Sequence, residues 1–250
     1  MTHSFSLINT PSRLIILAVL IGTTPSFANT EIELELGLVK TGFNYFKRPN
    51  DNVGTRVDLE SGKAQTYGRL QGYYHFNNQH ALRFLAAPLA VDYQQTATTA
   101  TRYGDTTFPA GSQLDIRYQF NSYRLGYVYT LSSSNNHNIS IGFTGKIRDA
   151  MIRVNADNLN AEFSNVGFVP LFYAAAETTI HQTLIIGMQA DGAAAPQGGA
   201  IDLSLYAGVD TDYEVSIKFG GRYLEGGADN DSLVGFAQFW YGFGSLSMKI

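Results

Sequence analysis

Apolar and polar residues alternate with a period of two along most of the chain from residue 31 onward. Between residues 112 and 131 the even positions are apolar up to Phe120, and the odd positions are apolar from Tyr123. This period is typical of a β-strand whose two faces meet different surroundings. The change of phase falls at Asn121-Ser122, where it predicts a β-bulge that re-aims the side chains.

Nine further segments show the same alternation and bring the predicted number of strands to about ten. They are residues 31–38, 69–76, 80–95, 139–148, 166–179, 184–191, 201–210, 214–222 and 232–250. The segment 166–179 is apolar on both faces, so eight strands are the alternative if it and segment 184–191 are not strands. Helical periodicity is confined to the first residues, and the sequence therefore predicts an all-β domain.

Strand length and connector length point to a membrane barrel. Several alternating runs are far longer than the five or six residues of an ordinary soluble strand, and a tilted membrane-spanning strand needs roughly nine to eleven. The connectors after odd strands are long and those after even strands are short, as in outer-membrane barrels with periplasmic turns. The long ones are 44–63, 96–111, 153–161, 193–199 and 226–231, and the short ones are 77–79, 132–136, 181–182 and 211–212.

A closed sheet also satisfies every backbone hydrogen-bonding group, which hydrocarbon demands. We therefore predict a transmembrane, antiparallel, up-and-down β-barrel with both ends of the chain on the periplasmic side. In this assignment Ile116 faces lipid and Gln119 faces the lumen.

The first 28 residues predict a cleavable secretory signal peptide. Arg13 precedes the apolar run 14–22, and Ser26 and Ala28 are the small residues of a cleavage site. The expected domains are a signal peptide at 1–28 and a barrel at 29–250. Without the signal peptide, 16 basic and 21 acidic residues remain and the net charge is −5, which is not the balance of a nucleic-acid-binding protein.

Composition agrees with a barrel of this kind. Charged residues make up only 15% of the chain, below the roughly 25% of an ordinary soluble domain. The mean hydropathy of −0.08 is nevertheless too low for a helical membrane protein. The alternating strands, the signal peptide and the apolar C-terminal strand SLSMKI together resemble small outer-membrane β-barrel proteins of Gram-negative bacteria.

This resemblance implies a porin-like protein of the cell envelope, located in the outer membrane. Outer-membrane lipids and lipopolysaccharide would surround the barrel, and the barrel assembly machinery would insert it. Such barrels commonly end in Phe, whereas this chain ends in Ile250. The pattern indicates an architecture and leaves the oligomeric state open.

The predicted inward face carries charges of both signs, which could pair and plug the lumen or could line a narrow polar pore. Eight strands already leave an interior that side chains fill, which favours the plug. The predicted lumen residues are Glu33, Glu35, Arg69, Asp115, Arg117, Arg124, Lys146, Arg148, Glu177, Asp191, Asp202, Asp210, Glu214, Lys218 and Arg222.

The loops offer weaker candidates. Five basic residues could meet lipopolysaccharide phosphates, although acidic neighbours make a simply solvated loop equally compatible: Lys47, Arg48, Arg56, Lys63 and Arg102. The four histidines after residue 28 all lie beside predicted periplasmic turns, on the wrong side for the outer-rim chemistry of barrel proteases and lipid A-modifying barrels. With no cysteine and no clustered ligand set, we expect no cofactor and no metal.

Three functions follow from this sequence, in decreasing order of support. The first is a structural or surface-interaction barrel whose lumen is plugged by paired charges. The second is a narrow channel for small polar solutes, and the third is an outer-membrane hydrolase. Loop 44–63 is the predicted contact segment of the first.

Overall fold

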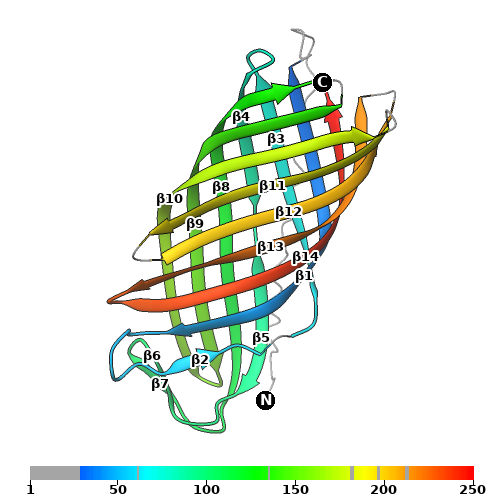
Figure 1. Cartoon of the computed structure of the whole chain (residues 1–250). Helices are drawn as coiled ribbons and strands as arrows, with labels where there is room; N and C mark the ends of the chain where they lie inside the picture. Colours follow the sequence, from blue (N-terminus) through cyan, green and yellow to red (C-terminus); the bar gives the residue numbers. More distant parts are fainter. Residues whose placement is uncertain (1–28, 61, 135, 181–182, 196–197, 212–213) are drawn as a thin grey trace, which may run out of the picture.

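The chain folds into one closed, antiparallel β-barrel (Figure 1). The structure, a computed structural model, describes residues 29–60, 62–134, 136–180, 183–195, 198–211 and 214–250. The predicted signal peptide lies outside the described residues. No helix in the described ranges is both long and apolar enough to cross a membrane.

The strands follow one another around the wall in chain order. Their bounds are β1 (Thr30–Lys47), β2 (Arg56–Asp58), β3 (Gln65–His75), β4 (His80–Ala87), β5 (Ala90–Thr96), β6 (Thr101–Tyr103), β7 (Thr106–Phe108), β8 (Gln113–Ser133), β9 (His137–Ala156), β10 (Leu159–Ile180), β11 (Leu184–Ala195), β12 (Gly198–Asp210), β13 (Val215–Asn230) and β14 (Leu233–Lys249).

Closure comes from the pairing of β1 with β14, from Glu31 opposite Lys249 to Lys47 opposite Val234, with one shift of register between Thr41 and Phe43. β4 and β5 form one wall strand, because both pair with β8 and only Pro88 and Leu89 separate them. A proline lacks the N–H that a ladder needs, so the strand is interrupted there. The wall therefore contains ten strands, which confirms the predicted number and excludes eight.

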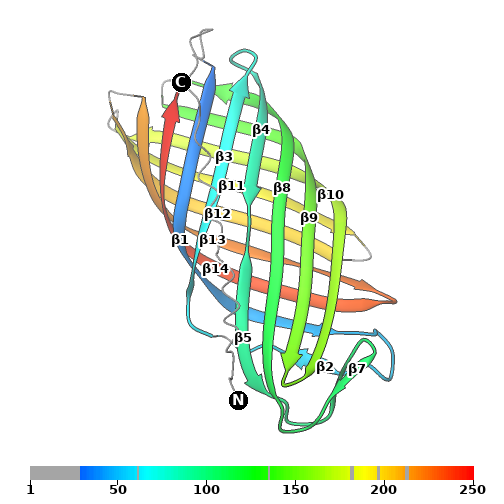
Figure 2. The same cartoon turned by 180° about the vertical axis from the view of Figure 1, so that it is seen from behind.

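The two ends of the barrel differ (Figures 1 and 2). The C-terminus and the start of β1 lie together at one end, here called the terminal end, where Ile250 N donates to Thr30 O at 2.8 Å. β2, β6 and β7 cover the opposite end, here called the loop end. The short connectors after β3, β8, β10 and β12 are all at the terminal end, as the sequence predicts.

The connectors at the loop end are shorter than predicted in three of five cases. β9 runs to Ala156 and β10 begins at Leu159, so most of the expected loop 153–161 is strand. The expected loops 193–199 and 226–231 are likewise mostly strand, in β11 to β14. Only 48–64 and 97–112 are long, and they contain the short strands β2, β6 and β7.

The β-bulge predicted at Asn121-Ser122 is wrong. β8 pairs with β9 in unbroken register from Asp115 to Thr130, and the register shifts only between Thr130 and Ser132. The same face therefore points inward along this whole stretch, and the residues on it change from apolar to polar. Ile116, predicted to face lipid, is 2% exposed and points inward.

Polarity also inverts along the neighbouring strand β9. Its outward residues are apolar up to Ile147 and become polar with Asp149 and Arg153. Its inward residues are polar up to Arg148 and become apolar from Ala150 onward. The outward face of β9 is thus apolar near the terminal end, and its inward face is apolar near the loop end.

This inversion divides the barrel into two zones along its axis. In the zone nearer the terminal end, apolar side chains form an exposed belt, which only hydrocarbon would cover. In the zone nearer the loop end, here called the extension, polar residues face outward as they would in water. The belt includes Leu34, Leu36, Leu38, Phe84, Leu125, Phe143, Ile147, Phe168, Phe172, Leu205, Phe219, Trp240 and Leu246.

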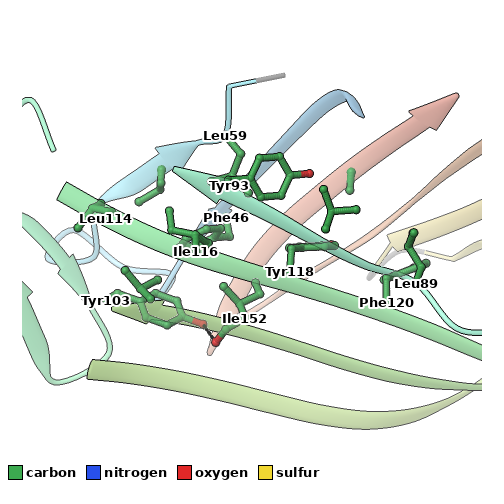
Figure 3. Close-up of a cluster of buried hydrophobic side chains, with 14 of the residues drawn as sticks. Phe46, Leu59, Leu89, Tyr93, Tyr103, Leu114, Ile116, Tyr118, Phe120 and Ile152 are labelled. Carbon is green, nitrogen blue, oxygen red and sulfur yellow. Dashed lines mark hydrogen bonds between the residues drawn. The ribbon is translucent and has the colours of Figure 1, made fainter. Parts of the chain in front are cut away.

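An apolar core fills the interior of the extension (Figure 3). Phe46, Tyr103 and Phe108 are fully buried in it, and Leu114 and Ile116 of β8 pack beside them. Phe46 and Tyr103 meet edge to face with ring centroids 5.1 Å apart. This cluster, here called the apolar plug, closes the barrel at the loop end in the way a soluble protein closes its core.

The pairing of β10 with β11 stops at Phe172 opposite Gly192. Residues 159–171 of β10 pair with β9 on one side and have no strand partner on the other within the described ranges. Pro170 lies just beyond the last pair, where its missing N–H fits a strand edge. The short β11–β12 hairpin therefore leaves a step in the wall of the barrel.

The inversion predicts that an arginine on one face of β8 has position-dependent effects. Leu125→Arg enters the belt and should lower the free energy of unfolding by about 2–4 kcal/mol. Gln113→Arg, on the same outward face but in the extension, should change it by less than about 0.5 kcal/mol. Urea unfolding in phospholipid vesicles, followed by Trp240 fluorescence, measures both; an equal loss at both positions would contradict the two-zone assignment.

Candidate functional site

A layer of buried charges crosses the lumen at the level of the belt. Its members come from eight strands around the wall, and each is less than 9% exposed. They are Glu35, Arg69, Arg83, Arg124, Lys146, Asp191, Asp202 and Arg222, here called the charge layer. Seven of the eight were predicted lumen residues, and the inward half of the strand alternation is what places them there.

Asp202 of β12 binds three arginines, more than any other carboxylate of the layer. Arg69 donates to it at 3.2 Å, Arg124 at 2.6 Å and Arg222 at 2.8 Å. These three arginines come from β3, β8 and β13. One carboxylate thus connects opposite walls of the barrel, because ionised partners give the shorter and stronger hydrogen bonds.

Asp191 of β11 forms a second centre. Arg83 donates to its carboxylate at 2.9 Å and Arg124 at 2.7 Å, while the Thr144 hydroxyl donates at 2.9 Å. Arg124 therefore bridges Asp191 and Asp202. Its Nε donates to Ser122 at 2.9 Å, which fixes the guanidinium plane.

Glu35 of β1 connects the layer to the strand that closes the barrel. Arg222 forms an ion pair with it, and the Tyr67 hydroxyl donates to it at 2.6 Å. Tyr67 also meets Tyr241 edge to face, with ring centroids 4.7 Å apart. The layer thereby passes from charged side chains to aromatic ones toward the loop end.

A wider cavity of about 160 Å³ lies between the charge layer and the terminal end. Lys218 sits on its wall with its Nζ 3.5 Å from Glu177 and 4.0 Å from Glu33. Asp210 accepts a hydrogen bond from Ser216 nearby. Glu214, predicted to face the lumen, is instead exposed in the turn before β13, with φ of +57°.

Two other predicted lumen residues are wrongly placed. Asp115 and Arg117 point outward from the extension, because the inward face of β8 does not change at Asn121. Arg117 pairs there with Asp92 at 3.0 Å in solvent. Arg148 does point inward, but it lies half-buried above the layer and donates to Asn165 at 2.7 Å.

Sequence reasoning missed Arg83, which is 1% exposed and stacks over the Tyr173 ring at 4.5 Å. Its inward neighbours Ala81 and Leu85 are apolar, so the inward face of β4 does not look polar. The signal that could have found it is a single arginine in a segment otherwise suited to lipid, since such charges almost always face an interior.

The predicted basic residues of the loops mostly hold the loops together. Arg56 donates to both carboxylate oxygens of Asp58 and lies over the Tyr45 ring at 3.7 Å. Arg48 stacks on Phe163 at 4.4 Å, and Arg102 Nε donates to Gly104 O at 3.1 Å. Lys47 is half-buried and Lys63 is exposed.

The turn after Arg48 is fixed by an aspartate. The backbone N–H groups of Gly54 and Val53 donate to the Asp51 carboxylate at 2.9 and 2.8 Å. These hydrogen bonds favour the ionised form and lower the pKa of Asp51.

Histidines and acidic residues do not gather into a site in the described part of the chain. His75, His80 and His137 lie at strand ends near the terminal end, as predicted, while His181 is outside the described residues. No group of three or more potential metal ligands occurs among the described residues. The chemistry that the charge layer can carry is therefore electrostatic, since its groups bind one another.

Comparison with known proteins shows the fold. No family model matches the sequence, and no curated protein matches it. Among solved structures, the outer membrane protease OmpT of Escherichia coli has a TM-score of 0.56 at 8% identity, over 92% of this chain and 99% of that one. The attachment invasion locus protein Ail of Yersinia pestis scores 0.40 at 10% identity, over 88% and 99%. The chain has the fold of outer-membrane β-barrel proteins.

We expect that neutralising a buried carboxylate of the charge layer lowers the free energy of unfolding much more than neutralising an exposed carboxylate. Asp202→Asn should lower the free energy of unfolding by about 3–5 kcal/mol, because it removes the buried carboxylate that pairs with Arg69 and one of the two that pair with Arg124 and with Arg222. Asp92→Asn removes the partner of Arg117 in solvent and should cost less than about 1 kcal/mol. Urea titration of both variants gives the comparison, and similar costs would mean that the layer does not depend on its ion pairs.

Proposed function

We propose that this protein is an integral outer-membrane β-barrel whose lumen does not conduct and whose extension is a rigid contact surface outside the cell. The exposed apolar belt, the closed wall and the fold shared with outer-membrane barrels support the membrane location.

The observation that carries the proposal is the pair of barriers along the barrel axis. The charge layer fills the lumen at belt level with side chains that bind one another. Between the charge layer and the loop end, the apolar plug fills the extension with residues that are nearly all less than 9% exposed. A solute path would have to break buried ion pairs and then separate a packed apolar core.

The orientation follows from the connectors. The short turns, the start of β1 and the C-terminus share the terminal end, which we assign to the periplasm. The predicted signal peptide at 1–28 would deliver the chain to that side, and the barrel assembly machinery would then insert it. The extension and the long loops 48–64 and 97–112 would then face the medium.

Lipopolysaccharide is the contact that the surface chemistry favours. Lys40 is exposed on the outward face, opposite Trp240 at the boundary of the belt, where lipid phosphates would lie. Arg117 is exposed farther into the extension, beside Asp92. Of the predicted loop contacts, Lys63 is exposed, while Arg48 and Arg102 hold the loops together. We therefore assign phosphate contacts to the boundary of the belt more than to the loops.

The two other hypotheses have less support from the geometry. A narrow channel for small polar solutes would need a continuous polar lumen, whereas the lumen of the extension is apolar. A hydrolase would need reactive groups at the loop end, whereas the described histidines are at the other end. The likeness to a protease rests on 8% identity and concerns the fold.

Conductance in planar bilayers tests the closed lumen. The purified protein should give no steady current, because both barriers are intact. Neutralising one member of the layer, as in Glu35→Gln, should not open it, since the apolar plug remains. A stable conductance in the native protein that changes with Glu35→Gln would support the channel instead.

Surface labelling in intact cells tests the orientation. An epitope tag placed after Gly62 should be accessible to antibody, because loop 48–64 faces outward. A tag placed after Ser134, in the turn between β8 and β9, should be labelled only after the outer membrane is permeabilised. The reverse result would overturn the orientation without affecting the fold.

A further inference from the structure

The charge layer is not balanced. It contains five cationic side chains, Arg69, Arg83, Arg124, Lys146 and Arg222, and three carboxylates, all less than 9% exposed. Burying an uncompensated charge costs several kcal/mol. Within the layer, two positive charges therefore have no carboxylate to balance them, and the further lumen carboxylates Glu33 and Glu177 lie beside Lys218.

Lys146 is the cation that stands apart. It is 1% exposed, and no carboxylate of the described residues lies within 4.0 Å of its Nζ. Its ammonium group lies 4.7 Å from the centre of the Phe120 ring, which belongs to the apolar plug. By contrast Lys218, the other inward lysine of the belt zone, is close to Glu177 and Glu33.

A small cavity adjoins Lys146, where the charge layer meets the apolar plug. Its volume is about 30 Å³. Four cationic side chains line it, Arg69, Arg124, Lys146 and Arg222, and Asp202 is the only carboxylate among its lining residues. The buried Nε of Arg222 has no hydrogen-bond acceptor among the described residues.

We propose that this cavity binds one small monovalent inorganic anion, chloride in the cell, with Lys146 as its principal ligand. Hydrogen-bond donors and positive charge surround the cavity in excess, as an anion requires. Water could satisfy the donors, but it could not neutralise the two surplus charges. The cavity is of the order of one or two water molecules, so a tetrahedral oxyanion such as sulfate is too large.

The anion would complete the barrier between the two zones. It would lie on the inner side of Phe120, between the arginines that hold Asp202 and the ammonium group of Lys146. The proposed site is independent of any partner of the surface, so it stands or falls separately from the contact function.

A structural experiment locates the ion. The protein is refolded and crystallised in sodium bromide, and the anomalous signal of bromine is measured. A peak in the cavity beside Lys146 is expected, and the same peak should be absent from Lys146→Met, which keeps the length of the side chain without its charge. Absence of the peak from the native protein would overturn the proposal and leave water, or a neutral lysine, in the cavity.

A stability measurement checks the same site in solution. At constant ionic strength, the urea midpoint should rise as chloride replaces gluconate, because a ligand of the folded state stabilises it. The rise should be lost in Lys146→Met and kept in the control Lys218→Met, whose lysine already has carboxylate partners. A midpoint that ignores chloride, or a rise that persists in Lys146→Met, would show that the anion does not bind here.

Discussion

Hydrocarbon offers no hydrogen-bond partner to a backbone, and the rest of this structure depends on that constraint. The wall closes because β1 and β14 satisfy each other along their whole length. Closure then creates an inside that is shielded from lipid, and only there can residues such as Arg124 and Asp191 be buried together. The step beside β10 shows the limit of the rule, since the unpaired edge of residues 159–171 rises mostly into the extension, beyond the short β11–β12 hairpin.

The interior solves two packing problems with different chemistry. Where the outside is apolar, the inside is held by ion pairs between distant strands, as with Asp202 and its three arginines. Where the outside is polar, the inside is an ordinary apolar core around Phe46 and Tyr103. The belt zone thus has polar groups inside and apolar groups outside, and the extension has the reverse. Side chains fill the lumen in both zones.

The sequence alone predicts much of this, because period-two alternation reports directly on faces. It yields the ten strands, the short turns and seven of the eight residues of the charge layer. It does not reveal which medium each face meets, because the pattern of Leu114 to Phe120 is the same whether lipid lies outside or a core lies inside. Because of that ambiguity, the sequence wrongly predicts a β-bulge at Asn121-Ser122 and an inward orientation of Asp115 and Arg117. The alternation also does not predict which charged residues pair with one another, since Arg83 and Asp191 are 108 residues apart.

The change of polarity between Ile147 and Asp149 also fixes how deep the barrel sits. Sliding outward by one pair of residues would carry Ile147 into water, and sliding inward would carry Asp149 into hydrocarbon. The neighbouring strand β8 changes at the same height, because Tyr123 lies opposite Ile147 and Asn121 lies opposite Asp149. The penalties of the two strands therefore add and act against vertical movement. The outward change of polarity thus sets the depth of the barrel in the membrane, and anything attached to its outer rim is held at a constant height above the bilayer.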